Sequence, residues 1–308
     1  MNDDKHNIKE NDMATIGFIG LGIMGAPMAG HLASHGHRLF TYTHGETPAS
    51  LIEAGAVACA NSAEVARQAD VIIVMVPDTP QVEEVLFGEY GVAAGLTAGK
   101  VVVDMSSISP VATKDFAKRI REFGCEYLDA PVSGGEVGAK AASLTIMVGG
   151  SEAAFDRVRP LFQLMGKNIT LVGGNGDGQI TKVANQIIVA LTIEAVGEAL
   201  LLAAKAGADP ARVREALMGG FASSRILEVH GERMVKRNFG PGFRIDLHRK
   251  DLNLALTTAR QLGVALPNTA TAQELFNTCA AHDGGSWDHS AMVRALEIMA
   301  NFAIGQEA

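Results

Sequence analysis

A chain of 308 residues exceeds the usual size of a single domain, so its length favours two domains. Its composition, 47% hydrophobic and 19% charged, is that of a globular protein with a sizeable core. The net charge of −8 argues against nucleic acid or an anionic membrane surface as a partner, because both attract basic patches.

The N-terminus and the cysteines favour a cytoplasmic protein. Residues 1–13 are polar and charged, without the apolar stretch of a secretory signal, and are expected to form a flexible extension. Cys59, Cys125 and Cys279 are scattered, without metal-type spacing. Free thiols in a reducing compartment are the simplest interpretation.

Between residue 15 and about residue 173, short apolar runs alternate with helix-compatible stretches. This alternation predicts an α/β domain of the doubly wound, Rossmann type, with a mostly parallel sheet covered by helices on both faces. The expected strands are 15–19, 38–42, 71–76, 101–105 and 144–148, and the expected helices are 24–34, 62–68, 81–87, 111–123 and 152–164.

After the glycine-rich run 173–178, which we interpret as a flexible break, strand patterns disappear. Glu194, Glu198 and Lys205 interrupt the apolar run 187–206 and favour a buried helix over a membrane span. We place a boundary near Asn175, with a dinucleotide-binding domain over 14–175 and an all-helical domain, including the long interdomain helix, over 176–308. The expected helices are 179–206, 210–218, 224–237, 247–262, 269–281 and 290–301.

A glycine motif follows the first expected strand and opens a helix. Gly20-Leu21-Gly22-Ile23-Met24-Gly25 has G-x-G-x-x-G spacing. The first glycine permits a tight turn, the second lets the backbone approach a pyrophosphate, and the third packs helix against strand. The phosphates then meet the N–H groups at the helix N-terminus. The motif in this context predicts binding of NAD or NADP.

The end of the second strand leaves the choice between NAD and NADP open. An NAD-selective site places Asp or Glu there, to bind the ribose 2′-hydroxyl, whereas an arginine accommodates a 2′-phosphate. The strand ends Tyr42-Thr43-His44, so Thr43 occupies the expected position of the acid. Glu46 lies close by, but beyond the strand.

A second glycine-rich segment, 129–135, follows a short strand and ends in Ser133-Gly134-Gly135. The glycines leave backbone N–H groups unobstructed and the serine hydroxyl adds a donor, an arrangement that suits a carboxylate. A plain glycine-rich turn is the alternative, and the segment alone does not decide between the two.

Lys182 and Asn185 are three residues apart in the expected long helix and therefore share a face. Their neighbours are apolar, so we expect the lysine to lose solvent and its pKa to fall from about 10.4. Such an ammonium can protonate a carbonyl oxygen as hydride arrives, and accept the proton in the reverse direction. Asn185 can orient the ammonium or bond the substrate oxygen. A lysine that extends to solvent is the alternative.

Other polar residues are given structural roles. His44, His230, His248 and His289 are scattered without paired ligand spacing, so we expect surface or structural histidines and no metal site. Asp246 lies near Lys250-Asp251-Leu252, and both aspartates are expected to cap helices or make interdomain contacts.

Together these segments resemble the β-hydroxyacid dehydrogenase family. The resemblance runs from about residue 15 to residue 301 and implies a Rossmann domain and a helical domain joined by the long helix, with the active site between them. The segments that carry it are 17–25 for the opening signature, 129–135 for the substrate loop, 178–185 for the catalytic helix and 250–252 for the C-terminal motif.

The resemblance also implies roles for individual residues. Lys182 would be the acid/base, the Ser133-Gly134-Gly135 segment would hold the substrate carboxylate, and Ser107 and Lys250 would lie beside the cofactor. Some relatives carry asparagine at the position of Gln186, so either Asn185 or Gln186 contacts substrate. We favour Asn185.

Segments 104–110, 219–224 and 241–243 resemble those of family members that reduce tartronate semialdehyde to glycerate in glyoxylate metabolism. That activity is expected here, in a homo-oligomer, either a dimer or a tetramer. Oxidation of 3-hydroxyisobutyrate is the alternative. A relative of 6-phosphogluconate dehydrogenase would need more basic residues than Arg233, Lys236 and Arg237. A non-catalytic dinucleotide-binding protein is a more distant alternative, because it would not need Lys182.

Overall fold

The structure, a computed structural model, describes residues 13–305. The chain forms two compact units, a first that ends at Lys182 and a second that begins at Val183. This division falls within a helix, a few residues beyond Asn175. The extension expected over residues 1–13 lies, apart from Met13, outside the described residues.

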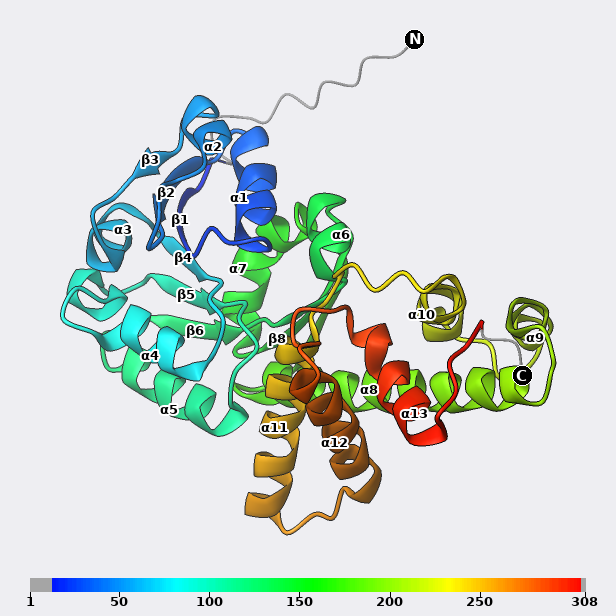
Figure 1. Ribbon diagram of the computed structural model, residues 1–308. Coiled ribbons are helices and arrows are strands. Elements are labelled where there is room, and N and C mark those ends of the chain that lie inside the picture. The colour runs from blue at the N-terminus through cyan, green and yellow to red at the C-terminus, as the bar shows by residue number, and fades with distance from the viewer. Residues whose placement is uncertain (1–12, 306–308) are drawn as a thin grey trace. The chain divides into compact units, whose positions relative to one another are not determined.

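A mostly parallel sheet forms the centre of the first unit (Figure 1). Its strand order is β3-β2-β1-β4-β5-β6-β8-β7, with β9 paired to β8. Only the pairs β6–β8 and β7–β8 are antiparallel. The strands are β1 Thr15–Ile19, β2 Arg38–Tyr42, β3 Val57–Ala58, β4 Val71–Val74, β5 Val101–Asp104, β6 Glu126–Asp129, β7 Val132–Ser133, β8 Leu144–Gly149 and β9 Gly166–Gly173.

Both faces of this sheet are buried, as its continuous apolar strands predict. In β4, Val71 and Ile73 pack into one hydrophobic cluster, while Ile72 and Val74 pack into another. Alternate side chains of a strand point to opposite faces, so each cluster is the core between the sheet and one helical layer. The helices are α1 Gly25–Ser34, α2 Ala49–Glu53, α3 Ser62–Gln68, α4 Thr79–Phe87, α5 Pro110–Arg121, α6 Gly135–Lys140 and α7 Glu152–Gln163, with the 3₁₀ helix η2 Val92–Gly95.

β9, a strand of eight residues, was not predicted from the sequence. β9 pairs only with β8, and polar residues such as Lys167 and Asn168 are exposed on it. An edge strand of this kind lacks the continuous apolar run that identifies the central strands.

The second unit is helical, as expected. Its core gathers residues of α8, α10, α11, α12 and α13, among them Ile193, Leu252 and Phe276, which are fully buried. The elements are α8 Asp177–Lys205, which begins in the first unit, then α9 Pro210–Met218, α10 Arg225–Lys236, α11 Ile245–Leu262, α12 Pro267–Ala281, η3 His289–Met292 and α13 Val293–Ala300.

Helix α8 is long and apolar enough to cross a membrane, with a mean hydropathy of 2.1 over its most apolar window. Ala190, Ile193 and Leu200 are nevertheless fully buried in the core of the second unit. These contacts make α8 the central helix of that unit, as the sequence analysis expects.

The glycine-rich run 173–178 is not the flexible break that its composition indicates. Gly173 ends β9 and Asp177 begins α8, so three residues connect the two elements. Two of them are tied to β6: Asn175 Nδ2 donates to the carbonyl of Tyr127 at 2.7 Å, and Gly176 N donates to Asp129 Oδ1 at 2.8 Å. The glycines serve a tight, hydrogen-bonded connection.

Candidate active site

The three glycines in the loop between β1 and α1 have different surroundings. Gly20 has φ +93°, and a Cβ there would lie 2.2 Å from the carbonyl oxygen of Met75. A Cβ on Gly25 would lie 1.9 Å from the carbonyl oxygen of Gly20. A Cβ on Gly22 would meet nothing within 4 Å. Gly20 and Gly25 therefore close the turn, and the backbone at Gly22 is open to a ligand.

The expected cofactor residues of the first unit lie at one edge of the sheet, whereas Lys250 lies in α11 of the second unit. The Gly20–Gly25 loop follows β1, Thr43 follows β2, and Ser107 lies just beyond β5. In the strand order, β1 lies between β2 and β4, which is where the order reverses. Dinucleotides bind at such a switch point, outside the carboxyl ends of the strands. The residues present fit a bound dinucleotide.

Two buried carboxyl groups, Asp104 and Asp129, end the neighbouring strands β5 and β6. Asp104 accepts hydrogen bonds from Ser106 N at 2.9 Å and from the Tyr127 hydroxyl at 3.2 Å. Burial raises the pKa of Asp104 to about 7, against the opposing effect of these hydrogen bonds. Asp104 therefore titrates near neutral pH.

Asp129 holds the N-terminus of α8. Its two oxygens accept from Gly176 N at 2.8 Å and from Gln179 N at 3.0 Å. These donors are among the N–H groups that a helix leaves unpaired at its start. Burial raises the pKa of Asp129 to about 6, although the two N–H groups favour the charged form.

Gln179 links the first turn of α8 to the loop after β5. Its Nε2 donates to the carbonyl of Ser106 at 2.8 Å, and its Oε1 accepts from Ile108 N at 3.1 Å. These bonds bracket Ser107, which the sequence analysis places beside the cofactor. Lys182, three residues beyond Gln179, is buried, with 7% of its surface exposed. One side chain thus ties the expected catalytic helix to the expected cofactor loop.

The Ser133-Gly134-Gly135 segment begins a short helix. Ser133 ends β7, which pairs with β8, and Gly135 is the first residue of α6. Gly134 has φ +132° and Gly135 has φ +60°, conformations that favour glycine. The backbone N–H groups at the start of α6 are available donors for an anion.

Asn185 and Gln186 take different positions on α8. Gln186 is buried, its Nε2 donates to Asp251 Oδ2 at 2.6 Å, and its Oε1 accepts from Asn185 Nδ2 at 2.8 Å. Because a carboxylate only accepts, Asp251 sets the orientation of the Gln186 amide, and Gln186 in turn sets that of Asn185. Asn185 is only partly buried, and its bond to Gln186 uses one of the two N–H groups of its amide.

Lys250 joins the same group of residues, because its Nζ lies 3.1 Å from Asp251 Oδ1. Of the two roles expected for Asp251, capping of a helix is wrong, because Asp251 lies inside α11, where it bonds to Gln186 of α8. Asp246, in contrast, lies in the first turn of α11, where it pairs with Arg249.

Three of the four histidines interpreted as scattered are in contact. His248, His289 and His230 form a hydrogen-bonded series, whereas His44 lies exposed in the loop after β2. Asp288 lies beside this series. Residues from α10, α11 and η3 meet here, and no local pattern of sequence signals it.

Two family models together cover nearly the whole chain. The one described as the NAD-binding domain of 6-phosphogluconate dehydrogenase matches residues 15–174. The other, described as NAD-binding of NADP-dependent 3-hydroxyisobutyrate dehydrogenase, matches residues 176–296. The 2-hydroxy-3-oxopropionate reductase of Escherichia coli is 67% identical over 93% of this chain and 98% of its own length.

The chain belongs to the β-hydroxyacid dehydrogenase family. Another relative of this dehydrogenase is the 2-(hydroxymethyl)glutarate dehydrogenase of Eubacterium barkeri, 39% identical over 94% of this chain and 97% of its own length. Among solved structures, the 3-hydroxyisobutyrate dehydrogenase of Mycobacterium tuberculosis with L-serine has a TM-score of 0.85 and 32% identity, covering 92% of this chain and 99% of that one.

The predicted family, fold class and cofactor class are therefore confirmed. The dehydrogenase uses NAD(P), and its family acts on small hydroxyacids. From the sequence, Gln179 was given no role and His248 only a surface or structural one. Both act through partners far along the chain, 71–73 residues away for the Gln179 side chain and 41 or 62 for His248.

Proposed function

We propose that this dehydrogenase reduces tartronate semialdehyde to glycerate, with Lys182 as the acid/base. The observation that carries the proposal is the 67% identity to 2-hydroxy-3-oxopropionate reductase, which extends over 93% of this chain. It is supported by the segments 104–110, 219–224 and 241–243 singled out from the sequence. We also propose 14–175 as the functional dinucleotide-binding domain and 176–308 as the helical domain.

Each step of the proposed reaction has a residue to perform it. The reduced nicotinamide, when bound, supplies the hydride to the aldehyde carbon. The Lys182 ammonium gives its proton to the aldehyde oxygen, which becomes the new hydroxyl group. The N–H groups at Ser133, Gly134 and Gly135 bind the carboxylate, away from the reacting carbon. Asn185, oriented by Gln186, bonds a substrate oxygen.

Cofactor recognition is assigned to the first unit and to Lys250. The Gly20–Gly25 loop approaches the pyrophosphate, with Gly22 nearest to it because its backbone is open. Thr43 is assigned to the ribose, and Ser107 and Lys250 are assigned to contacts with the cofactor. Thr43 neither repels a 2′-phosphate nor pairs with it. We therefore expect the specificity constants for NADH and NADPH to differ by less than about a thousandfold, or roughly 4 kcal/mol.

The substrate assignment is tested with two semialdehydes of equal size. Tartronate semialdehyde carries a hydroxyl where methylmalonate semialdehyde carries a methyl group. A site built to bond a hydroxyl rejects the analogue that lacks it by several orders of magnitude. We expect kcat/KM to be higher for tartronate semialdehyde by at least about a hundredfold, with either coenzyme. A preference for the methyl analogue would favour 3-hydroxyisobutyrate as the product, and activity on neither would refute the proposed function.

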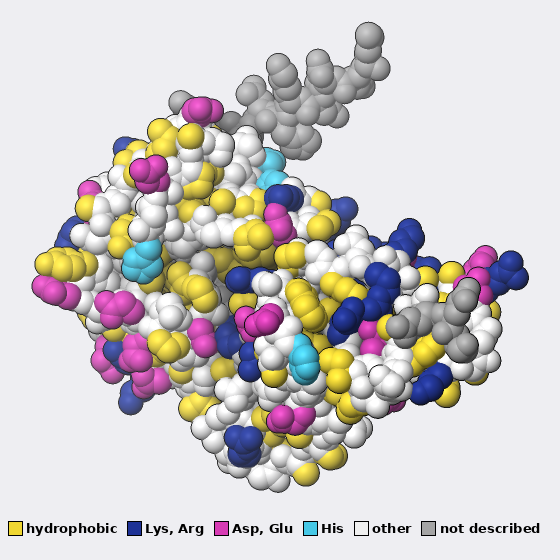
Figure 2. All heavy atoms as spheres, in the orientation of Figure 1, with side chains coloured by type: hydrophobic (Ala, Val, Ile, Leu, Met, Phe, Trp, Pro, Cys, Tyr) yellow, Lys and Arg dark blue, Asp and Glu magenta, His cyan; other side chains and the backbone are white. Residues whose placement is uncertain are grey.

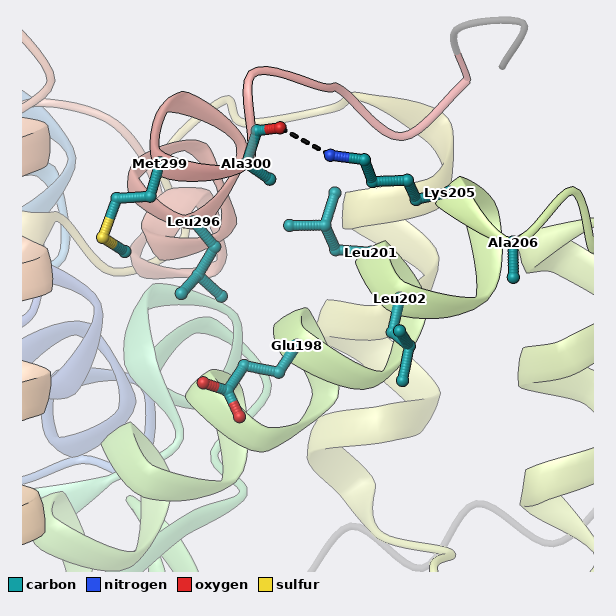
Figure 3. A pocket seen from close by; sticks show the side chains of 8 residues that line it. All are labelled: Glu198, Leu201, Leu202, Lys205, Ala206, Leu296, Met299 and Ala300. Atoms are coloured by element: carbon teal, nitrogen blue, oxygen red, sulfur yellow. Dashed lines mark hydrogen bonds between the residues drawn. The ribbon is translucent and has the colours of Figure 1, made fainter.

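We further propose a cytoplasmic homo-oligomer. Cys59, Cys125 and Cys279 are free thiols, which fits a reducing compartment. Helix α8 and helix α13 line an apolar groove of about 600 Å³, in which Leu202 and Met299 are largely exposed (Figure 3). The groove also contains Glu198 and Lys205. A second copy packed antiparallel on α8 would place each lysine near the partner's glutamate, a pairing that suits a two-fold contact.

A further inference from the structure

A series of hydrogen bonds runs through three histidines of the second unit. His248 Nε2 lies 3.1 Å from the backbone carbonyl of Gln186, and its Nδ1 lies 2.9 Å from His289 Nδ1. His289 Nε2 then lies 3.2 Å from His230 Nε2. His248 is fully buried and His289 nearly so. The series therefore starts at α8, beside Asn185, and ends at α10.

These contacts determine where each proton lies. A carbonyl only accepts, so His248 must carry its proton on Nε2. In a neutral ring the Nδ1 of His248 is then an acceptor, and His289 must donate from its own Nδ1. The Nε2 of His289 becomes an acceptor in turn, and His230 must donate from Nε2. Burial and the two neighbouring histidines lower the pKa of His289, which keeps this ring neutral.

Asp288 lies at the far end of the series, with its Oδ1 3.6 Å from His230 Nδ1. Asp288 Oδ2 accepts from the backbone N–H groups of Gly242 and Phe243, and Asp288 Oδ1 accepts from Ser290 N and Ser290 Oγ. The Arg233 guanidinium lies 3.5 Å from Oδ2. A carboxylate with four hydrogen bonds and an arginine beside it is a poor ligand for a cation, although His230, Asp288 and His289 lie close enough together to surround one.

The near end of the series meets the residues assigned to substrate and cofactor. His248 and Asp251, three residues apart on α11, both bond to Gln186 of α8, one to its carbonyl and the other to its side chain. Together they hold α11 against α8 at two points. The same contacts orient Asn185 through Gln186, and place Lys250 through its ion pair with Asp251.

We propose that His248 and His289 are positioning residues of this dehydrogenase. The fixed proton order of the histidine series keeps His248 as a hydrogen-bond donor to the carbonyl of Gln186. This bond in turn orients Asn185 and Lys250. The reverse order would turn a lone pair of His248 Nε2 toward the Gln186 carbonyl and open one of the two points of contact. The effect on turnover rests on the proposed function, whereas the proton order does not.

The proton order is tested without any substrate. Long-range ¹H–¹⁵N correlation spectra of the intact enzyme labelled with ¹⁵N-histidine distinguish the two neutral tautomers and the cation. At pH 8 we expect Nε2–H on His248, Nδ1–H on His289 and Nε2–H on His230, with His230→Gln and His289→Asn used for assignment. An Nε2–H tautomer or a cation at His289 would overturn the proposal. So would a shift of all three rings on addition of one equivalent of Zn²⁺, which would indicate a metal site.

A matched pair of variants tests the positioning role. In His289→Asn, the amide Nδ2 takes the place of the ring Nδ1 and can still donate to His248, whereas His289→Leu cannot donate. Both variants remove the acceptor for His230 equally. We expect His289→Leu to lose about ten- to a hundredfold in kcat/KM for the semialdehyde, and His289→Asn to lose less than about threefold.

Equal losses in the two variants, or full activity in His289→Leu, would overturn the positioning role. If His289→Leu does not fold, the tautomers of the unmodified enzyme still decide the proton order. If the enzyme is inactive with every semialdehyde while the tautomers are as expected, the proposed function fails and the proton order stands.

Discussion

In this dehydrogenase, residues of one type can differ in how strictly the fold requires them. A Cβ added to Gly20 or Gly25 would lie too close to a backbone oxygen, whereas a Cβ added to Gly22 would meet no other atom. The fold requires glycine at the first two positions, and the third is assigned to the approach of the cofactor. The buried polar residues divide in the same way: Asp104 and Asp129 support the structure, and Lys182 is assigned to the chemistry.

Replacement of Lys182 tests that assignment. Lys182→Ala should lower kcat by about 10²–10⁴, because the general acid is lost, and should leave coenzyme affinity nearly unchanged, because the lysine lies outside the glycine loop. Lys182→Arg should lose a similar factor, since a guanidinium does not release its proton at these pH values. Steady-state kinetics and coenzyme fluorescence titration measure the two effects, with the exposed Lys118→Ala as control. A near-normal kcat in Lys182→Ala would remove Lys182 from the acid/base role.

The raised pKa of Asp104 predicts a pH-dependent stability. Its pKa is about 7 in the folded protein and 3.8 in the unfolded chain, so its contribution to stability is fully present below about pH 3.8 and is lost as pH rises through 7. Asn at this position does not titrate and keeps an acceptor for Ser106 N. The melting temperature of Asp104→Asn relative to the native enzyme should therefore rise between pH 5 and pH 8. The corresponding free energy is a few kcal/mol, at about 1.4 kcal/mol for each pKa unit. A difference that does not change with pH would contradict the shift.

At the scale of elements, the first turn of α8 is where separate parts of the first unit are joined. β6 holds it through Asp129, and the loop after β5 holds it through Gln179. The helix therefore begins at a fixed point relative to the sheet, and Lys182 follows one turn later. Apolar packing alone would not fix the start of the helix to this degree, because hydrophobic contacts have no preferred direction.

Removal of the Gln179 side chain tests this attachment. Gln179→Leu leaves the N–H of Ile108 and the carbonyl of Ser106 without their partner, at a cost of about 1–3 kcal/mol in the free energy of unfolding for each buried group. Displacement of Lys182 by the loosened turn should lower kcat by about ten- to a hundredfold. Thermal melting and steady-state kinetics on both substrates measure the effects. Gln163→Leu, on the exposed face of α7, should change neither, and an unchanged kcat in Gln179→Leu would show that α8 is held by other contacts.

Elements and site residues could be predicted from the sequence where the interactions that form them join residues close together in the chain. β1 and β2 match their predicted bounds, and α3 and α9 do as well, because apolar periodicity and nearby caps define them locally. The position of the glycine motif after β1 could likewise be predicted from the sequence. β9 was missed because its hydrogen bonds with β8, and not its composition, make it a strand. The histidine series and the Gln179 contacts were missed because their partners are distant in sequence.

At the scale of the whole molecule, the net charge of −8 argues against nucleic acid as a partner. On the face shown in Figure 2, Lys and Arg side chains lie among Asp and Glu side chains. The apolar groove along α8 and α13 is a different kind of surface, with few polar groups apart from Glu198 and Lys205 (Figure 3). Contiguous exposed apolar surface is typical of contacts between proteins, and this groove is therefore the contact that we propose for the homo-oligomer.

A charge placed in that groove tests whether the partner is a second copy. Light scattering should give the native enzyme a mass that is a multiple of 32.3 kDa. Leu202→Glu should lower it to that of a monomer, because a carboxylate would be buried against leucines in the contact. Leu202 is 73% exposed and Leu262 is 69% exposed, so Leu262→Glu is a matched control that should leave the mass unchanged. A monomeric native enzyme would contradict the proposed oligomer, and an unchanged mass in Leu202→Glu would place the contact elsewhere.

The attachment of α8 to Asp129 also has a consequence during synthesis on the ribosome. The carboxylate leaves the ribosome long before the N–H groups that pair with it, which follow 47 and 50 residues later. At about 5–20 residues per second, the nascent chain carries this group without its partners for roughly 2–10 seconds. The parallel strands β1, β2, β4, β5 and β6 can already pair in that interval. The sheet that they form then has the solvated carboxylate of Asp129 at the end of β6. The hydrogen bonds to Asp129 need only the chain up to Lys182, where the first unit ends. The first unit can therefore finish folding while the helical unit is still being translated.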